Sequence, residues 1–243
     1  MSGRRAASAD PQSFDSFAAS YDRRDELNGG WVTEWLTGVL ADRRGVSAIE
    51  LGCGSGRVAT LLAEHYDRVR AVDLSPEMIR IARSKHSHPR IVFEQGDLTQ
   101  ITGRYDLVVS IMTLHHVPDL TKTLEQLSSL VAPGGAAILV DAAQPPKPRW
   151  MFHVGNLLRL ASDIRHRHRF AWERFRLNSD RKWIDHKVSD RFLSPEEFVR
   201  TYEQAFPGAA VAPVSGLYTA VWERLDNSII EPTARSELHR TQP

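Results

Sequence analysis

The stretch that decides the fold reads Glu50-Leu51-Gly52-Cys53-Gly54-Ser55-Gly56-Arg57, between an apolar run at 46–51 and a helical pattern at 57–65. Glycines allow backbone conformations with positive φ, and a ligand can come close to them because they have no Cβ. A loop at the start of a helix is also expected to present free backbone N–H groups, which attract negative charge. This stretch therefore predicts a ligand-binding turn between a strand and a helix.

Around this loop the chain alternates short apolar runs with helical patterns. Strands are predicted at 46–51, 69–73, 91–94, 105–111 and 136–140. Further helices are predicted from Ser75-Pro76-Glu77 onward and at 119–131. Pro133-Gly134-Gly135 is expected to end the latter and to turn the chain into the next strand. The alternation predicts an α/β fold around a parallel sheet with helices on both faces.

The pattern changes after the fifth predicted strand. Residues 142–193 are first rich in proline and then in arginine, histidine and tryptophan, without a strand period. Ser194-Pro195-Glu196-Glu197 is a capping box that predicts a helix to about Ala205. Two strand patterns follow, and Ser215-Gly216 between them predicts a hairpin.

Two acidic residues are predicted to lie at the same edge of the sheet as the glycine loop. Asp73 closes the second strand 21 positions after Gly52, a spacing at which a carboxylate can accept both hydroxyls of a ribose. Asp97, in Gln95-Gly96-Asp97-Leu98, follows the third strand. Because ligands of open α/β sheets bind at the carboxyl ends of the strands, these features should converge on one ligand.

The position of the third glycine in the loop distinguishes between two classes of ligand. A dinucleotide fold requires G-x-G-x-x-G, whose last glycine would stand at position 57. Arg57 stands there, and the third glycine, Gly56, comes one residue early. The loop therefore suits a nucleoside with a small zwitterionic tail, which argues against a nicotinamide- or flavin-dependent oxidoreductase.

Composition excludes several classes of protein. The 243 residues are 42% hydrophobic and 25% charged, which suits one domain with a full hydrophobic core. The single cysteine, Cys53, excludes an intramolecular disulfide and a multi-cysteine zinc site. A net charge of +1 gives no signal for DNA or for a membrane. Without an apolar run long enough for a signal peptide or a membrane span, we expect a cytoplasmic protein with no DNA partner.

Taken together and in order, these motifs resemble those of the class I S-adenosylmethionine-dependent methyltransferases that act on small molecules. The resemblance rests on Glu50–Gly56, Ala71–Met78, Gln95–Leu98, Tyr105–Ser110, Leu114–Asp119 and Ala132–Gly135. It covers residues 14–141, and 194–224 resemble the last helix and final strand pair of that family. It implies a doubly wound, Rossmann-like, seven-stranded sheet, mostly parallel with an antiparallel last strand and helices on both faces.

The resemblance also implies a division of the chain. Residues 1–35 would form N-terminal lid helices, and 36–141 with 194–225 would form the methyltransferase core as a single domain. Residues 142–193 would be an inserted cap over the substrate, and 226–243 a polar C-terminal tail.

The cofactor implied is S-adenosyl-L-methionine, with S-adenosyl-L-homocysteine as product. Its binding residues would be Tyr21, Glu50, Gly52, Gly54, Gly56, Asp73, Leu74, Met78, Gly96, Asp97, Leu98 and Ser110. Glu50 would reach the amino group, directly or through water, and Tyr21 would lie near the carboxylate. Asp73 would hold the ribose hydroxyls and Asp97 the adenine amino group, while Ser110 would lie beside the sulfonium.

His115 and His116 follow the fourth predicted strand, beside the expected position of the methyl group. Methyl transfer from a sulfonium is an in-line displacement, so positioning and exclusion of water supply much of the catalysis. A general base helps where the acceptor is a neutral hydroxyl, and an imidazole titrates near neutral pH. We therefore expect a histidine-assisted reaction, with the alternative that either histidine only packs beneath the loop.

Some similar methyltransferases hold a divalent ion in this loop through an E-x-x-E-H motif. Here the stretch reads Met112-Thr113-Leu114-His115-His116 and contains no carboxylate. Because hard cations require oxygen ligands, we expect no metal.

The inserted segment is strongly basic. Residues 145–191 hold 12 Lys or Arg against 5 Asp or Glu. Trp150, Trp183 and His186 are candidate substrate residues here, and an anionic or aromatic acceptor is expected because arginine pairs with carboxylate or phosphate and stacks on rings. The alternatives are a solvated basic helix around Ile164–Arg176 and contact with RNA, a carrier protein or a membrane phosphate surface.

The sequence thus predicts metal-independent transfer of a methyl group to a small-molecule acceptor, at oxygen because of the histidine pair. Methylation at nitrogen or carbon, an RNA or protein methyltransferase, and a non-catalytic cofactor-binding protein are the alternatives. The chain lacks the Asn/Asp-Pro-Pro-aromatic motif typical of base N-methylation. It does not indicate an oligomeric state.

Overall fold

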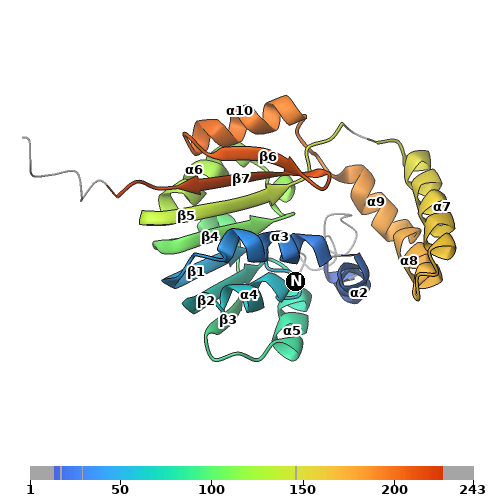
Figure 1. Cartoon of the computed structure of the whole chain (residues 1–243), viewed down its shortest axis with the longest axis horizontal. Coiled ribbons are helices and arrows are strands. Elements are labelled where there is room, and N and C mark those ends of the chain that lie inside the picture. The colour runs from blue at the N-terminus through green and yellow to red at the C-terminus, as the bar shows by residue number, and fades with distance from the viewer. Residues whose placement is uncertain (1–13, 17, 29, 146, 227–243) are drawn as a thin grey trace, which may run out of the picture.

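Seven strands form one sheet in the part of the chain that the computed structural model describes, which is residues 14–16, 18–28, 30–145 and 147–226. The strands are β1 (Gly45–Leu51), β2 (Tyr66–Asp73), β3 (Ile91–Gln95), β4 (Tyr105–Ile111), β5 (Val131–Asp141), β6 (Ala210–Val214) and β7 (Leu217–Glu223). Their order is β3-β2-β1-β4-β5-β7-β6 (Figure 1). The strands β1 to β5 run parallel, whereas β7 pairs antiparallel with both β5 and β6. The predicted Rossmann-like, mostly parallel sheet is confirmed.

Helices cover both faces of the sheet. They are α2 (Ala18–Asn28), α3 (Gly30–Leu40), α4 (Arg57–Leu62), α5 (Pro76–Lys85), α6 (Leu120–Leu130), α7 (Arg149–Arg165), α8 (Ala171–Asn178), α9 (Arg181–Ser189) and α10 (Pro195–Ala205), with short 3-10 helices η1 (Phe14–Ser16), η2 (Leu98–Gln100) and η3 (Leu114–His116). Side chains of α3, α4 and α5 belong to one buried cluster, and those of α6 and α10 to another.

The central strands contribute to both clusters. In β1, Ala48 packs in the cluster under α3, α4 and α5, whereas Ile49 packs in the cluster under α6 and α10. In β4, Leu107 and Val108 divide in the same way. Because successive side chains of a strand point to opposite faces, a continuous apolar run fills both layers. Because β1 and β4 are parallel neighbours, the glycine loop after β1 and the loop after β4 lie together at the carboxyl edge of the sheet.

Two local predictions are confirmed and one is wrong. Ser194 and Glu197 bond each other's backbone N–H groups, which completes the capping box of α10. Ser215 and Gly216 both have positive φ, 49° and 84°, in the two-residue turn of the β6–β7 hairpin. Pro133-Gly134-Gly135, in contrast, does not form a turn before the strand. β5 begins directly after α6 and includes these residues, where its pairing with β4 shifts register.

The cap lies over the carboxyl edge of the parallel strands. In Figure 1, α2 and the helices α7, α8 and α9 gather at this edge, and α7 is the farthest from the sheet. A helix was predicted around Ile164–Arg176, but α7 ends at Arg165 and α8 begins at Ala171, so the chain breaks within that range. None of the described helices is both long and apolar enough to cross a bilayer.

Two predicted segment boundaries, at residues 35 and 226, can be compared with the helices and with the described residues. The end of the lid at residue 35 falls within α3, whose Leu36 and Leu40 are fully buried in the core beneath that helix. α3 therefore belongs with the sheet, and of the described parts of the predicted lid only η1 and α2 lie over the carboxyl edge of the sheet. The predicted tail at 226–243 lies outside the described residues except for Asp226.

Candidate functional site

The glycine loop folds tightly against β2. Gly52 and Cys53 donate their N–H groups to the carbonyl oxygen of Val72, at 2.8 and 3.0 Å, and Gly54 donates to the Asp73 carboxylate at 2.8 Å. The expectation that these groups face a ligand is wrong, because the protein itself accepts them. Position 52 requires glycine, because a Cβ there would lie 2.1 Å from the hydroxyl oxygen of Thr113.

A cavity of about 250 Å³ opens where the loop meets the carboxyl ends of the strands. Nine of the twelve residues predicted to bind the cofactor line it: Tyr21, Gly52, Gly54, Asp73, Leu74, Met78, Gly96, Asp97 and Leu98. The same cavity is also lined by residues that were not predicted to bind the cofactor, among them Phe14, Ile111, Met112 and Thr113. Segments far apart in the chain therefore meet at one site, as the spacing of the acids predicted.

The other three predicted residues lie behind the wall of this cavity. Gly56 faces Phe93, whose ring would lie 2.7 Å from a Cβ, so this glycine allows α4 to pack on β3. Ser110 is fully buried and donates to the Leu51 carbonyl oxygen at 2.9 Å, instead of pointing toward a ligand. Glu50 is buried beneath the loop.

The Glu50 carboxyl group is incompletely satisfied. Its Oε2 has no hydrogen-bond partner among the described residues. Burial, together with the nearby Asp73 carboxylate, raises the pKa of Glu50 well above its usual value. A buried acceptor of this kind fits a cationic group such as the ammonium of an amino acid, which would satisfy the oxygen and lower the pKa.

The two acids of the cavity are held by hydrogen bonds from the loops that follow the parallel strands. Asp73 accepts from the N–H groups of Gly54 and Ser75, at 2.8 and 2.9 Å, and burial is the main cause that raises its pKa. Asp97 accepts from the N–H and the hydroxyl of Thr99, at 2.8 and 2.7 Å. Each carboxylate is thus held in one orientation at the cavity wall.

A second cavity of about 700 Å³ lies between α2, η3 and the cap. It shares Phe14, Tyr21, Met112 and His116 with the smaller cavity. The Phe14 ring contacts the rings of Tyr21 and His116 edge-on, with centroids 5.1 and 5.4 Å apart. Met112 adopts a positive φ of 54°, which is uncommon for a residue with a side chain. These four side chains form the boundary between the two cavities, which we call the junction.

His115 lines the larger cavity and is paired with Asp141. Its Nδ1 lies 2.7 Å from Oδ1 of Asp141, and its backbone N–H donates to Oδ2 of the same carboxylate at 2.9 Å. Both side chains are about 95% buried. Asp141 was not predicted, although it follows the apolar run of β5 just as Asp73 follows that of β2. The same rule would have found it.

His116 lies at the junction, and its ring is tilted against two further imidazoles. Its ring centroid is 3.9 Å from that of His115 and 5.2 Å from that of His186. Burial, and then the positive potential of these two histidines, lowers the pKa of His116 to about 2. His116 is therefore neutral at physiological pH.

Asp190 of the cap completes a group that the sequence did not reveal. His115, His116 and Asp190 each offer one potential ligand atom, and these atoms lie within 4.8 Å of one another. We expected no metal because residues 112–116 contain no carboxylate, but the fold supplies one from the cap. Two imidazoles and one carboxylate suit a transition metal better than a hard cation such as Mg²⁺.

Four cations also line the larger cavity: Arg24, Lys147, Arg159 and Lys187. Arg24 is buried, stacks over Trp183 at 4.0 Å, and has two nitrogens, Nε and Nη1, without partners among the described residues. Burial lowers the pKa of Arg24 to about 10 and that of Lys187 to about 8, where the neighbouring cations add to the effect. Asp25 and Asp190 line the same cavity, so its cations outnumber its carboxylates by four to two.

Two of the three predicted substrate residues line the larger cavity, and the third does not. Trp183 and His186 line the larger cavity and stack on each other, with ring centroids 5.2 Å apart. Trp150 lines neither cavity, because it is exposed on the opposite side of α7, and Phe152 lies at the cavity instead.

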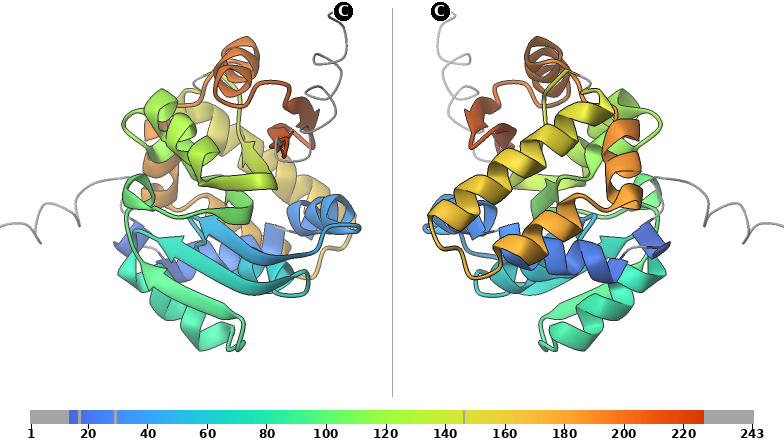
Figure 2. Two further views of the ribbon diagram at one scale, coloured as in Figure 1. Left: turned by 90° about the vertical axis from the view of Figure 1, so that its left-hand side faces the viewer. Right: turned by 90° about the vertical axis from the view of Figure 1, so that its right-hand side faces the viewer.

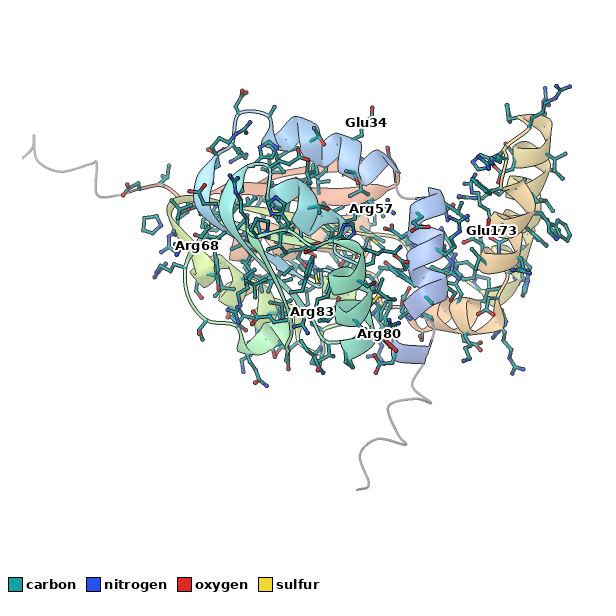
Figure 3. All side chains as sticks on the ribbon, turned by 90° about the horizontal axis from the view of Figure 1, so that it is seen from below. Glu34, Arg57, Arg68, Arg80, Arg83 and Glu173 are labelled. Carbon is teal, nitrogen blue, oxygen red and sulfur yellow. The ribbon has the colours of Figure 1, made fainter. Side chains whose placement is uncertain are left out.

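α2 joins the core to the cap. On the core side, Asp22 pairs with Lys85 at 2.5 Å and Asp25 pairs with Arg57 at 3.0 Å. On the cap side, Arg23 makes a two-point ion pair with Glu173. In Figure 3, Arg57 and Glu173 lie on opposite sides of α2. Because α2 carries Tyr21 of the junction and Arg24 of the larger cavity, this helix belongs to both halves of the site.

Comparison with known proteins places this geometry in a family. A family model described as a methyltransferase domain matches residues 23–184. The chain is 25% identical over 198 residues to a ubiquinone biosynthesis O-methyltransferase of Aeromonas salmonicida, covering 78% of this chain and 72% of that protein. It is 29% identical over 125 residues to the 27-O-demethylrifamycin SV methyltransferase of Amycolatopsis mediterranei, covering 48% and 46%.

The fold is shared with solved structures. The DhpI–SAH complex superposes with a TM-score of 0.59 at 21% identity, covering 87% of this chain and 94% of that one. The family model spans most of the described chain, including the glycine loop, both acids and the histidine pair. The chain therefore belongs to the class I methyltransferases, whose cofactor is S-adenosylmethionine.

Proposed function

We propose that this chain transfers the methyl group of S-adenosylmethionine to a hydroxyl oxygen of a small anionic acceptor, with His115 as general base and without a metal ion. The observation that carries the proposal is the His115–Asp141 pair in the larger cavity, next to the junction with the smaller one. The names of the two relatives, an O-methyltransferase and a 27-O-demethylrifamycin methyltransferase, agree with oxygen as the acceptor atom.

Asp141 determines which nitrogen of His115 holds the proton. The backbone N–H groups of His115 and Ala142 donate to this carboxylate and hold it in place. A carboxylate accepts from Nδ1–H, so the lone pair of His115 lies on Nε2. Nε2 can then take the proton of an acceptor hydroxyl as its oxygen bonds to the methyl carbon. Asp141 thus acts as a positioning residue.

His116 has a different role in this proposal. Its pKa of about 2 makes it a much weaker base than an ordinary imidazole, so we assign the role of general base to His115. It lies instead between the two cavities, where it excludes water and orients the reacting groups together with Phe14 and Met112.

The smaller cavity fits the cofactor. When bound, S-adenosylmethionine supplies a methyl group on a positively charged sulfur, which leaves as a neutral thioether. We assign Glu50 to its amino group, reached through water because Glu50 lies behind the cavity wall. Asp73 would hold the ribose hydroxyls and Asp97 the adenine amino group. The other cavity residues predicted from the sequence complete this set.

The larger cavity supports an acceptor with a carboxylate or phosphate group. Arg24 offers two buried nitrogens without partners, and an anion there would offset the mutual repulsion of Arg24, Arg159 and Lys187. Trp183 and Phe152 provide flat apolar surfaces for the body of the acceptor. An aromatic or polycyclic hydroxy acid has this combination of groups.

The decisive experiment measures S-adenosylhomocysteine formation across matched acceptors: phenols bearing a carboxylate, their methyl esters, and the corresponding anilines. We expect turnover of the carboxylated phenols, weaker turnover of the esters and none of the anilines. Arg24→Met should raise KM for the carboxylated phenols about tenfold or more and leave KM for the esters unchanged. Arg80→Met, a change at an exposed arginine of α5, serves as the control. Preferred turnover of the anilines would overturn oxygen as the acceptor atom.

A further inference from the structure

One face of α7 is apolar and exposed to solvent. It carries Trp150, Val154, Leu157, Leu158 and Ile164, which are between 45 and 67% exposed and which we call the outer face of α7. These positions recur with helical spacing and therefore form one stripe. The other side of the helix carries Phe152, Asn156 and Arg159 and lines the larger cavity.

No described residue covers this stripe. α7 lies at the edge of the molecule that is farthest from the sheet, and it runs along the surface that the right-hand view of Figure 2 presents. Trp172 of the neighbouring helix α8 is also 67% exposed. Contiguous exposed apolar surface of this kind marks an interaction site, because isolated chains otherwise bury it.

Cations stand at both ends of the stripe. Arg149, which pairs with Asp185, begins α7, and the fully exposed run Arg165-His166-Arg167-His168-Arg169 starts at the last residue of the helix. An apolar helix face flanked by cations is complementary to a surface with anionic headgroups above hydrocarbon. A second copy of this chain would bring the same cations to the contact, so like charges would face each other.

We infer that the outer face of α7 binds the surface of an anionic lipid bilayer. The helix has 17 residues and is about 25 Å long, so it lies along the surface rather than across the bilayer. Trp150 would sit at the level of the headgroups and the leucines below it, while the arginines meet lipid phosphates. The larger cavity then lies directly behind the membrane-facing helix.

Vesicle binding by the full chain tests this inference. We expect co-sedimentation with vesicles of phosphatidylcholine and phosphatidylglycerol, loss of binding as salt rises, and little binding to vesicles of phosphatidylcholine alone. Leu157→Glu places a charge at the centre of the stripe and should weaken binding about tenfold or more. Leu225→Glu, at an exposed leucine beyond β7, is the matched control and should bind like the wild type.

Calorimetry with S-adenosylhomocysteine verifies that each variant is folded, because none of these residues lines the smaller cavity. Equal binding of Leu157→Glu and wild type to anionic vesicles would overturn the inference, and so would equal binding of the wild type to both vesicle types. A dimer that Leu157→Glu dissociates, in a protein that binds no vesicles, would assign the stripe to a second copy instead.

Discussion

His115 depends on a neighbour for its proposed chemistry. Asp141 accepts both the backbone N–H of His115 and the hydrogen on its Nδ1, so one carboxylate sets the position and the tautomer of the ring. An amide at this position would keep the shape but could present its own N–H to Nδ1, which places the histidine proton on Nε2. Tautomer control, rather than charge alone, is therefore the property to test.

Asp141→Asn should lower kcat by about a hundredfold or more, within the range a general base contributes, while KM and cofactor affinity change little. A fall in kcat without a rise in KM separates this role from a merely structural one, which would weaken binding as well. Asp42→Asn, at an exposed position, is the matched control. Unchanged kcat in Asp141→Asn would remove His115 from the role of base.

The raised pKa of Glu50 leads to a second prediction about a single residue. This pKa is raised well above the ordinary value, mainly by burial, so the free protein keeps this proton to a higher pH than an exposed carboxyl group does. A cationic ammonium nearby favours the ionised form, so ligand binding should release protons and become tighter as pH rises through the pKa of the free protein. Calorimetry of S-adenosylhomocysteine binding in buffers of different ionisation enthalpy measures the number released.

Glu50→Gln should release fewer protons on binding, whereas the exposed Glu64→Gln should behave like the wild type. Equal proton release in both variants would show that Glu50 does not contact the ligand, directly or through water.

Among the elements, α10 shows how local sequence signals determine a boundary. Ser194 and Glu197 satisfy each other's backbone groups at the start of the helix, and Phe198 then enters the core. Ser194→Ala should lower the free energy of unfolding by about 1 kcal/mol, as the loss of a cap does. Denaturant unfolding measures this, with Ser84→Ala on α5 as a control that should remain within a few tenths of a kcal/mol. A loss no larger than that of the control would show that the cap does not stabilise α10.

An element could be predicted from the sequence where its own residue pattern determines it, and could not where contacts with other segments determine it. β1 and β4 were predicted almost to the residue because most of each apolar run is buried and belongs to clusters on both faces of the sheet. The break between α7 and α8 was missed because the run of arginines and histidines at 165–169 has no strong helix-ending residue. β5 was predicted to begin too late because pairing with β4 overrides the turn preference of proline and glycine.

The site shows the same division. Most residues of the smaller cavity follow strands of the core. Strand ends and spacing located the glycine loop, Asp73 and Asp97, and the family resemblance implied the other predicted residues. Trp183 and His186 of the larger cavity were predicted, but Arg24 and Asp190 were not. Their positions depend on tertiary contacts between α2 and the cap, such as the hydrogen bond from Arg24 to the Leu177 carbonyl oxygen. No local pattern encodes such contacts.

For the molecule as a whole, the meeting of core and cap creates the group of His115, His116 and Asp190. We propose that the reaction does not require a metal at this group, because His115 is needed as a base. Turnover should therefore stay within about twofold after treatment with EDTA and gel filtration, and elemental analysis of the purified protein should find no stoichiometric zinc or iron. Activity lost to the chelator and restored by Zn²⁺ or Mg²⁺ would contradict this.

The position of α2 bears on the timing of turnover. Phe14 and Tyr21 belong to the boundary of both cavities, and the ion pairs of α2 bind it to the core on one side and to the cap on the other. If α2 moves aside, both cavities open in the same event. The departure of the two products would then share one kinetic step, whose rate reflects the breaking of ion pairs such as Asp22–Lys85 that touch neither product.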